Sequence, residues 1–467
     1  MPVAARASTA IRRLAARHPR TKAVLKAVRF MPLVVSDRVW RLRHRRALGE
    51  LGTQPTLVLQ TTLSTAELTD PAQLEARFTG VRRGSNALYI PPQDGLAATF
   101  GLPFTVPPSA GVKLLLDFRP PAAAQYLHPD KASAARNAVS GSTSANALAG
   151  NYLFVAGLGP RIWDVVELRS AEGEAGTAFL VDHVATTKPT DDADCASFVA
   201  ALDGAIGNEL TVTYPGWRTT GDFGPPDCNG NLLIGAQGPR YVDFQNFRVD
   251  QIAWLERLSD VHSEVSHFGE TRIGRPDRYL YQNVPGLGAA AKRNVSRRWD
   301  RLAEALAEVG VEPTDRLLLD IGTNIGMILH HGLAAGAAWG LGWDHPAVAR
   351  AAEDLQLALG NSRIELCGAE LDEEHDFATD LRPELRAGLA ESVIFYLSVH
   401  RHIGFPSWIR EGHWRALVYE GHDGESVTEA AANARRLVGQ GPAITPVRMG
   451  TDGDSGRRPY CVAVRAD

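Results

Sequence analysis

The sequence predicts an α/β protein whose C-terminal part is a mostly parallel sheet covered by helices, preceded by an α+β domain. Two observations predict the parallel sheet. Residues 292–467 alternate short apolar runs with helical patterns and end in two runs that form a hairpin. Within them, residues 316–344 give a strand, a glycine turn, a helix and a second strand, with an acid at the end of each strand.

Composition places the chain among globular proteins of two or three domains. Its 467 residues are 44% hydrophobic and 22% charged, and no apolar run is long enough to span a membrane. The net charge of −4 gives no general attraction to nucleic acid, which we do not expect as a partner. The four cysteines are far apart, so we expect neither a metal site nor a disulfide framework, and we expect a cytoplasmic location.

Residues 1–50 form a basic arm with thirteen lysines and arginines between Arg6 and Arg46. Apolar residues recur among them at near-helical spacing, as in a helix that lies on an anionic membrane surface. Peripheral membrane contact is therefore one interpretation of the arm. A solvated helix that packs on the next domain is the other.

The glycine turn between the first two strands has the layout of a nucleotide-type site. Asp320 ends the first strand, and Gly322 and Gly326 flank the turn. Asp344 ends the next strand, 18 residues after Gly326. Glycines allow a ligand to approach the backbone closely, and the second acid can accept from two ribose hydroxyls. Dinucleotide folds and S-adenosylmethionine (SAM) folds share this layout, but Asn324 stands where a dinucleotide motif has its second glycine.

The sequence D-I-G-T-N-I-G, with the acid at the next strand, resembles the first motif of class I SAM-dependent methyltransferases in a variant without the middle glycine. The resemblance covers roughly residues 292–467 and implies a seven-stranded Rossmann-like sheet. It also implies that Asp344 binds the ribose, with His345 near the adenine and Glu370 and Leu371 beside the base. The residues that would surround the methionine part are Asp320, Gly322, Thr323, Asn324 and Gly326.

The loop after the fourth strand faces the methyl group in this class, and here it carries His400, Arg401 and His402. A histidine can take a hydroxyl proton at neutral pH, and an arginine can hold a carboxylate or phosphate. We therefore predict these three residues as catalytic. The end of the fifth strand, Glu420 to His422, is a second candidate group, from which Glu420 is also predicted as catalytic. The adjacent pair His330–His331 points in two directions on a helix, so we expect no metal there.

The N-terminal half resembles a degenerate protein-kinase-like fold. Lys113 lies inside an apolar strand, Asn231 precedes Leu-Leu-Ile, and Asp243 belongs to Val-Asp-Phe-Gln at the end of a hairpin. In such a fold the lysine contacts phosphates, while the asparagine and the aspartate hold Mg²⁺ against ATP. The usual His-Arg-Asp sequence is missing, since Pro226 stands five residues before Asn231. Kinase activity is therefore not our leading expectation.

These observations predict three parts: an arm over residues 1–50, a kinase-like domain over 51–284 and a methyltransferase domain over 285–467. The leading hypothesis is SAM-dependent methylation of an oxygen on a small molecule, natural product or glycan intermediate. The first alternative is a bifunctional kinase–methyltransferase that uses Mg-ATP as well and modifies a polysaccharide or glycolipid end. It would resemble known bacterial enzymes of that kind with the domain order reversed. The second alternative is a non-catalytic SAM-binding scaffold. The oligomeric state is not predicted.

Overall fold

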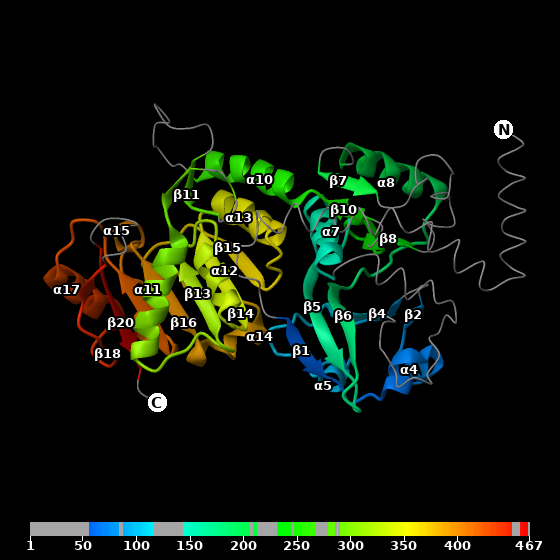
Figure 1. The fold of residues 1–467 in the computed structure, drawn as a ribbon, viewed down its shortest axis with the longest axis horizontal. Coiled ribbons are helices and arrows are strands. Elements are labelled where there is room, and N and C mark those ends of the chain that lie inside the picture. The colour runs from blue at the N-terminus through cyan, green and yellow to red at the C-terminus, as the bar shows by residue number, and fades with distance from the viewer. Residues whose placement is uncertain are drawn as a thin grey trace, which may run out of the picture. The chain divides into compact units, whose positions relative to one another are not determined.

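The protein has a mixed α/β fold with several sheets (Figure 1), seen here in a computed structural model. The structure describes residues 56–83, 87–115, 143–205, 209–212, 231–244, 247–266, 279–284, 287, 290–450 and 458–465. The basic arm predicted over residues 1–50 lies outside them. The chain divides into two compact units at Asp250–Gln251. This division falls upstream of the boundary at 284–285 that the sequence suggests, because the helix that starts at Gln251 belongs to the C-terminal unit.

A six-stranded sheet is the main element of the N-terminal unit, with the order β1-β5-β6-β4-β3-β2. Only β1 and β5 pair in parallel, so this sheet is mainly antiparallel. Its strands are β1 (Leu57–Gln60), β2 (Arg82–Arg83), β3 (Ala87–Ile90), β4 (Ala110–Leu115), β5 (Ile162–Arg169) and β6 (Ala175–Asp182).

The helices and two short strand pairs complete the described N-terminal unit. A hydrogen-bonded capping box, in which Ser64 and Glu67 each bond the other's backbone, starts the first of these helices. The helices are α3 (Thr65–Thr69), α4 (Pro71–Arg77), α5 (Leu96–Phe100), α7 (Thr143–Val155) and α8 (Asp192–Ala205). The antiparallel pairs are β7 (Leu210–Val212) with β10 (Phe247–Val249), and β8 (Leu232–Gly235) with β9 (Gly238–Tyr241).

The C-terminal unit contains one eight-stranded sheet with the order β15-β14-β13-β16-β17-β20-β18, in which β19 also pairs with β20. The first five strands of this order are parallel, and β20 runs antiparallel between β17 and the two edge strands. The strands are β13 (Leu317–Ile321), β14 (Trp339–Asp344), β15 (Ile364–Gly368), β16 (Val393–Leu397), β17 (Ala416–Glu420), β18 (Ala443–Ile444), β19 (Arg448–Met449) and β20 (Pro459–Val464).

The order of these strands agrees with the alternating units that the sequence predicts, and the central strands are buried along their whole length. The sheet differs from the expected seven strands because its outer edge is split into β18 and β19, of two residues each. A short helix lies between β15 and β16. Pro383 starts this four-residue helix, and Arg382 before it is extended, as residues before proline prefer.

Helices cover both faces of the parallel sheet (Figure 1). The helix before the first strand buries Trp299, Leu302 and Leu306, which recur at helical spacing along one face. The elements are α10 (Gln251–Val265), α11 (Val295–Glu308), α12 (Met327–Ala334), α13 (Pro346–Ala358), α14 (Pro383–Arg386), η2 (Leu389–Glu391), α15 (His400–Ile403), α16 (Ser407–Glu411) and α17 (Val427–Val438), with a parallel strand pair β11 (Tyr279–Gln282) and β12 (Ala290–Arg293).

The cysteines correct one sequence-based expectation. Cys195 on α8 is disulfide-bonded, whereas Cys367 and Cys461 are free. The wide spacing of the cysteines in the sequence gave no sign of this bond, because the residues that a fold brings together need not be close in sequence. One of the observations behind the expected cytoplasmic location therefore does not hold. Among the described helices, none combines the length and the apolar character that crossing a bilayer requires.

Candidate active site

The glycine turn after β13 departs from ordinary backbone at three positions. Gly322, Asn324 and Gly326 have φ angles of 76°, 54° and 74°, in the left-handed region that asparagine and glycine tolerate best. A Cβ atom on Gly322 would lie 2.5 Å from Cγ1 of Val399, which belongs to the loop after β16. The turn therefore requires glycine at position 322. Asparagine can replace the missing middle glycine because it adopts the same backbone region.

Gln282, at the end of β11, fixes the turn from the other side. Its amide nitrogen donates to the carbonyl of Thr323 at 3.1 Å, and its amide oxygen accepts from the N–H of Met327 at 3.1 Å. The side chain is buried, so both bonds are shielded from water. Gln282 was not predicted from the sequence, since nothing in the local pattern around position 282 indicates a long-range contact.

The two acids of the motif lie on adjacent strands and differ in their surroundings. Asp344 accepts from the backbone N–H groups of Asn324 and His345, both at 2.8 Å. Burial raises the pKa of Asp344, and these two hydrogen bonds oppose the rise. Each carboxylate oxygen keeps a further lone pair, so Asp344 can still accept from two hydroxyls.

Asp320 is more deeply buried, and burial raises the pKa of its carboxyl to about 7 although Thr323 donates to it at 2.9 Å. Beyond β14, His345 contacts the exposed side chain of Glu370, with 2.9 Å between Nε2 and Oε1. Leu371 follows and is partly exposed. The structure thus gathers the predicted turn residues around Asp320 and Asp344, and it places His345 and Glu370 together at the end of β14 and β15.

Three histidines meet at the carboxyl ends of β16 and β17. The ring of His422 lies 4.6 Å from that of His400 and 5.8 Å from that of His402 between centroids. Nε2 of His422 is buried and has no hydrogen-bond partner among the described residues. Burial, followed by nearby positive groups, lowers the pKa of this side chain to about 4. His422 is therefore neutral at pH 7. Arg401 and His402 are exposed beside it.

A buried tyrosine and a buried glutamate support the histidines. The hydroxyl of Tyr419 donates to Oε1 of Glu425 at 3.0 Å and lies 3.2 Å from Nδ1 of His400. Glu425 also accepts from the backbone N–H of His422 at 2.9 Å and from Asn433 at 2.9 Å. Burial lowers the pKa of His400, and the charge of Glu425 opposes this shift. The sequence analysis missed Tyr419 and Glu425.

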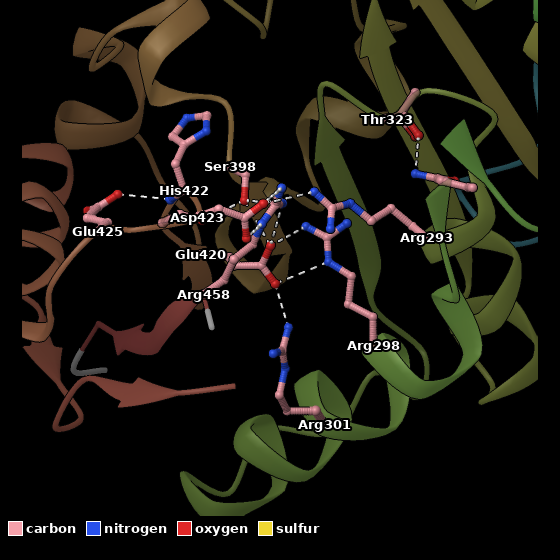
Figure 2. A network of polar contacts seen from close by, with 12 residues as sticks. Arg293, Arg298, Arg301, Thr323, Ser398, Glu420, His422, Asp423, Glu425 and Arg458 are labelled. Atoms are coloured by element: carbon pink, nitrogen blue, oxygen red, sulfur yellow. Dashed lines mark hydrogen bonds and ion pairs between the residues drawn. The ribbon is translucent and has the colours of Figure 1, made fainter. Parts of the chain in front are cut away.

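Glu420 is completely buried and is surrounded by arginines (Figure 2). Arg298 donates to it at 2.6 Å, Arg458 lies 3.3 Å away, and Arg301 bonds its second oxygen. Burial alone would raise the pKa of Glu420, but the three guanidinium groups outweigh it and hold the pKa at about 2. Glu420 therefore acts as an anchor for arginines in this structure. The arginines themselves were missed, because charged residues give no sign of burial in a sequence.

The remaining histidine pair is split, as the helix geometry requires. His330 is buried against Asn361, with 2.6 Å between Nδ1 and Nδ2, whereas His331 stacks on Trp299. Burial lowers the pKa of His330 to about 3, so this side chain is neutral. Within the described residues, no group of three histidine, cysteine or acidic side chains could hold a metal ion.

In the N-terminal unit, Lys113 and the backbone of Asn231 both contact Val242, the residue before Asp243. Nζ of Lys113 donates to the carbonyl of Val242 at 2.8 Å and lies 4.5 Å from the ring centre of Phe244. The backbone of Asn231 accepts from the N–H of Val242 at 2.9 Å, so it borders the same segment. Burial lowers the pKa of Lys113, and the charge of Asp243 opposes this shift.

Comparison with known proteins gave matches among solved structures only. No protein-family model matches the sequence, and no curated protein matches it. A structure described as the bifunctional kinase–methyltransferase WbdD is 18% identical with a TM-score of 0.30, over 45% of this chain and 46% of that chain. The chain thus spans less than half of the length of WbdD.

Two further structures match a similar share of this chain. EvdMO1 is 18% identical with a TM-score of 0.29, over 43% of this chain and 50% of that chain. The magnesium protoporphyrin IX methyltransferase ChlM from Synechocystis PCC 6803, solved with bound SAM, is 16% identical with a TM-score of 0.27. It is matched over 37% of this chain and 80% of that chain.

Proposed function

We propose that the C-terminal unit is a SAM-dependent methyltransferase that acts on an oxygen of a small molecule, natural product or glycan intermediate. The observation that carries this proposal is the turn between Asp320 and Asp344. Its backbone is held in the left-handed region at three positions, and the Asp344 carboxylate is fixed beside it by the N–H groups of Asn324 and His345. Such a turn offers backbone contacts to a bound nucleoside, and such an acid suits its ribose hydroxyls.

The bound cofactor would supply an electrophilic methyl group on a sulfonium. The protein's part would be to align the acceptor and to take its proton. His422 fits the second task because it is neutral at pH 7 and its buried Nε2 has no hydrogen-bond partner in the described structure. Tyr419 and Glu425 would orient His400 next to it. Glu420 does not fit the role of a base, since three arginines keep its pKa low and pair with both carboxylate oxygens.

Calorimetry with S-adenosylhomocysteine (SAH) tests the proposal. We expect the wild-type chain to bind SAH and Asp344→Ala to lose at least tenfold in affinity, because two charge-assisted hydrogen bonds to the ribose disappear. Glu304→Ala, an exposed change on α11, is the control and should bind as the wild type does. The absence of SAH binding to folded wild-type protein would refute the proposal and the alternative of a SAM-binding scaffold.

A second candidate function, Mg-ATP binding by the N-terminal unit, is favoured by one observation. Lys113, a half-buried lysine, lies against the Val242–Phe244 segment that carries Asp243. A lysine and an aspartate so placed could meet the phosphates and the Mg²⁺ of a nucleotide. Binding of Mg-ATP that is lost in Asp243→Ala and in Lys113→Met would support this function. Failure of the wild-type chain to bind Mg-ATP at millimolar concentration would exclude it.

A further inference from the structure

The arginine cluster around Glu420 carries more positive than negative charge. Among its described residues it contains four guanidinium groups and two carboxylates, those of Glu420 and Asp423. Asp320 also interacts with Arg298, but because burial raises the pKa of Asp320 to about 7, it balances that charge only in part. The four arginines are Arg293, Arg298, Arg301 and Arg458 (Figure 2).

Arg293 is the least neutralised of the described members. Its side chain is 5% exposed, and its ion pair with Asp423 is long, at 3.5 Å between Nη2 and Oδ2. A hydrogen bond also joins it to Tyr281, but its buried Nε has no hydrogen-bond partner within the part of the chain that the structure describes. A buried guanidinium is costly unless a close anion and full hydrogen bonding compensate it. The structure therefore leaves a donor for an anion at the end of β12.

Asp423 fills this place with an exposed side chain, which binds Arg458 through both carboxylate oxygens and Arg293 at longer range. Its side chain is 54% exposed, on the loop between β17 and α17. It is bound closely to Arg458, with 2.9 Å between Oδ1 and Nε, and loosely to Arg293. The next residue, Gly424, has a φ of 82° and no heavy atom within 4 Å of the position of a Cβ. The carboxylate that neutralises Arg293 thus faces solvent and can be exchanged for another anion.

The position of the cluster in the sheet indicates which ligand supplies that anion. Asp344, which suits the ribose, lies on β14 to one side of β13. The cluster lies to the other side, where Glu420 ends β17 and Arg458 precedes β20. Arg458 also donates to Ser398, directly after β16, at 2.7 Å. The cluster and the histidines therefore lie on one side of β13, and Asp344 lies on the other.

We propose that the methyl acceptor carries an anionic group, a carboxylate or a phosphate, which binds Arg293 and Arg458 in place of Asp423. This inference rests on the proposed methyltransferase function. Guanidinium groups bind both kinds of anion through paired N–H donors. The arginines would thus bind the anionic group of the acceptor, and the oxygen that is methylated would lie toward the histidines.

The electrostatics of Tyr281 agree with a site of positive potential. Burial alone would raise the pKa of this hydroxyl, yet the charges of Arg298, Arg458 and Arg293 lower it overall. An anion at this place would remove part of that potential. The phenol of Tyr281 would then also be available to donate to the anion.

Titration of the SAH-saturated chain with inorganic phosphate, and separately with acetate, tests the proposal at constant ionic strength. We expect each anion to bind the wild type saturably. Its affinity should be about threefold higher for Asp423→Asn and at least tenfold lower for Arg293→Gln. Asp423→Asn changes an exposed residue, so the test does not depend on the folding of a buried variant. Arg297→Gln, an exposed arginine on α11, is the matched control and should leave binding unchanged.

Two results would overturn the inference while SAH still binds. One is phosphate and acetate binding that Asp423→Asn and Arg293→Gln leave unchanged, or no such binding at all. The other is a loss of SAH affinity in Arg293→Gln without a loss of affinity for 5′-methylthioadenosine, which lacks the carboxylate. That result would assign the arginines to the cofactor. Failure of SAH to bind to the wild type would instead refute the methyltransferase function itself.

Discussion

Arg298 on α11 and Glu420 at the end of β17 form a buried ion pair, with 2.6 Å between Nη2 and Oε1. The pair joins the helix before the first strand to the fifth strand of the parallel order. Arg301, one turn further along the same helix, binds the second oxygen of Glu420. Because both arginines come from α11, this contact fixes the helix over the carboxyl end of the sheet where the candidate site lies.

We predict that Glu420→Gln destabilises the protein strongly, by about 3 kcal/mol, since it removes the buried anion that three guanidinium groups share. Urea unfolding followed by circular dichroism measures this loss. Glu308→Gln is the matched control, because its partner Arg448 is also an arginine at 2.6 Å but the pair is exposed. That change should cost less than about 1 kcal/mol. Equal losses in the two variants would contradict the role of Glu420.

The same pair predicts a pH dependence. The pKa of Glu420 is lowered from 4.5 to about 2 in the folded protein, so the folded state binds its proton less readily than the unfolded state. The stabilisation is therefore complete above pH 4.5 and is lost as the pH falls toward 2. The slope of unfolding free energy against pH in this window should be smaller in Glu420→Gln than in the wild type. An unchanged slope would count against the low pKa.

Gly322→Ala should weaken SAH binding and lower the melting temperature. The new Cβ would meet Val399 Cγ1 at 2.5 Å, and an alanine at a φ of 76° is strained by about 1 kcal/mol or more. Gly310→Ala separates the two effects, since Gly310 has a φ of 71° but open space around it. Only Gly322→Ala should lose SAH affinity, and adding Val399→Ala should restore part of it. Equal effects of the two glycine changes would contradict a role for the close approach.

His422 should remain neutral down to about pH 4, because burial and the neighbouring positive groups disfavour its charged form. Its ring protons can be followed by NMR in histidine-labelled protein, with His422→Gln to assign the signals. A midpoint near pH 4 is expected. A midpoint at the ordinary histidine pKa would mean that the ring is hydrated and charged more readily than its buried Nε2 implies, and it would weaken its assignment as the proton acceptor.

The sequence predicted the parts of the structure that depend on local pattern. The strands around Asp320 and Asp344 and the glycine turn follow from apolar runs and from residues that tolerate left-handed backbone. The split edge strand and the short helix at Pro383 were not predicted, since they depend on pairing and on where a proline falls.

The candidate site was predicted only in part. Residues at strand ends could be found, because parallel strands bring their carboxyl ends to one edge. The buried arginines could not, since Arg298 and Arg301 look in sequence like the exposed Arg297 beside them. Their burial depends on an acid more than a hundred residues away, Glu420. For the same reason Glu420 was expected to be catalytic, whereas its charge is taken up by three arginines.

A structure of the chain crystallised with SAH tests the central claim most directly. The account predicts that the ribose hydroxyls lie within hydrogen-bond distance of the Asp344 carboxylate and that the homocysteine part lies against the turn from Gly322 to Gly326. Unbound protein, or SAH held by residues that do not include Asp344, would contradict it.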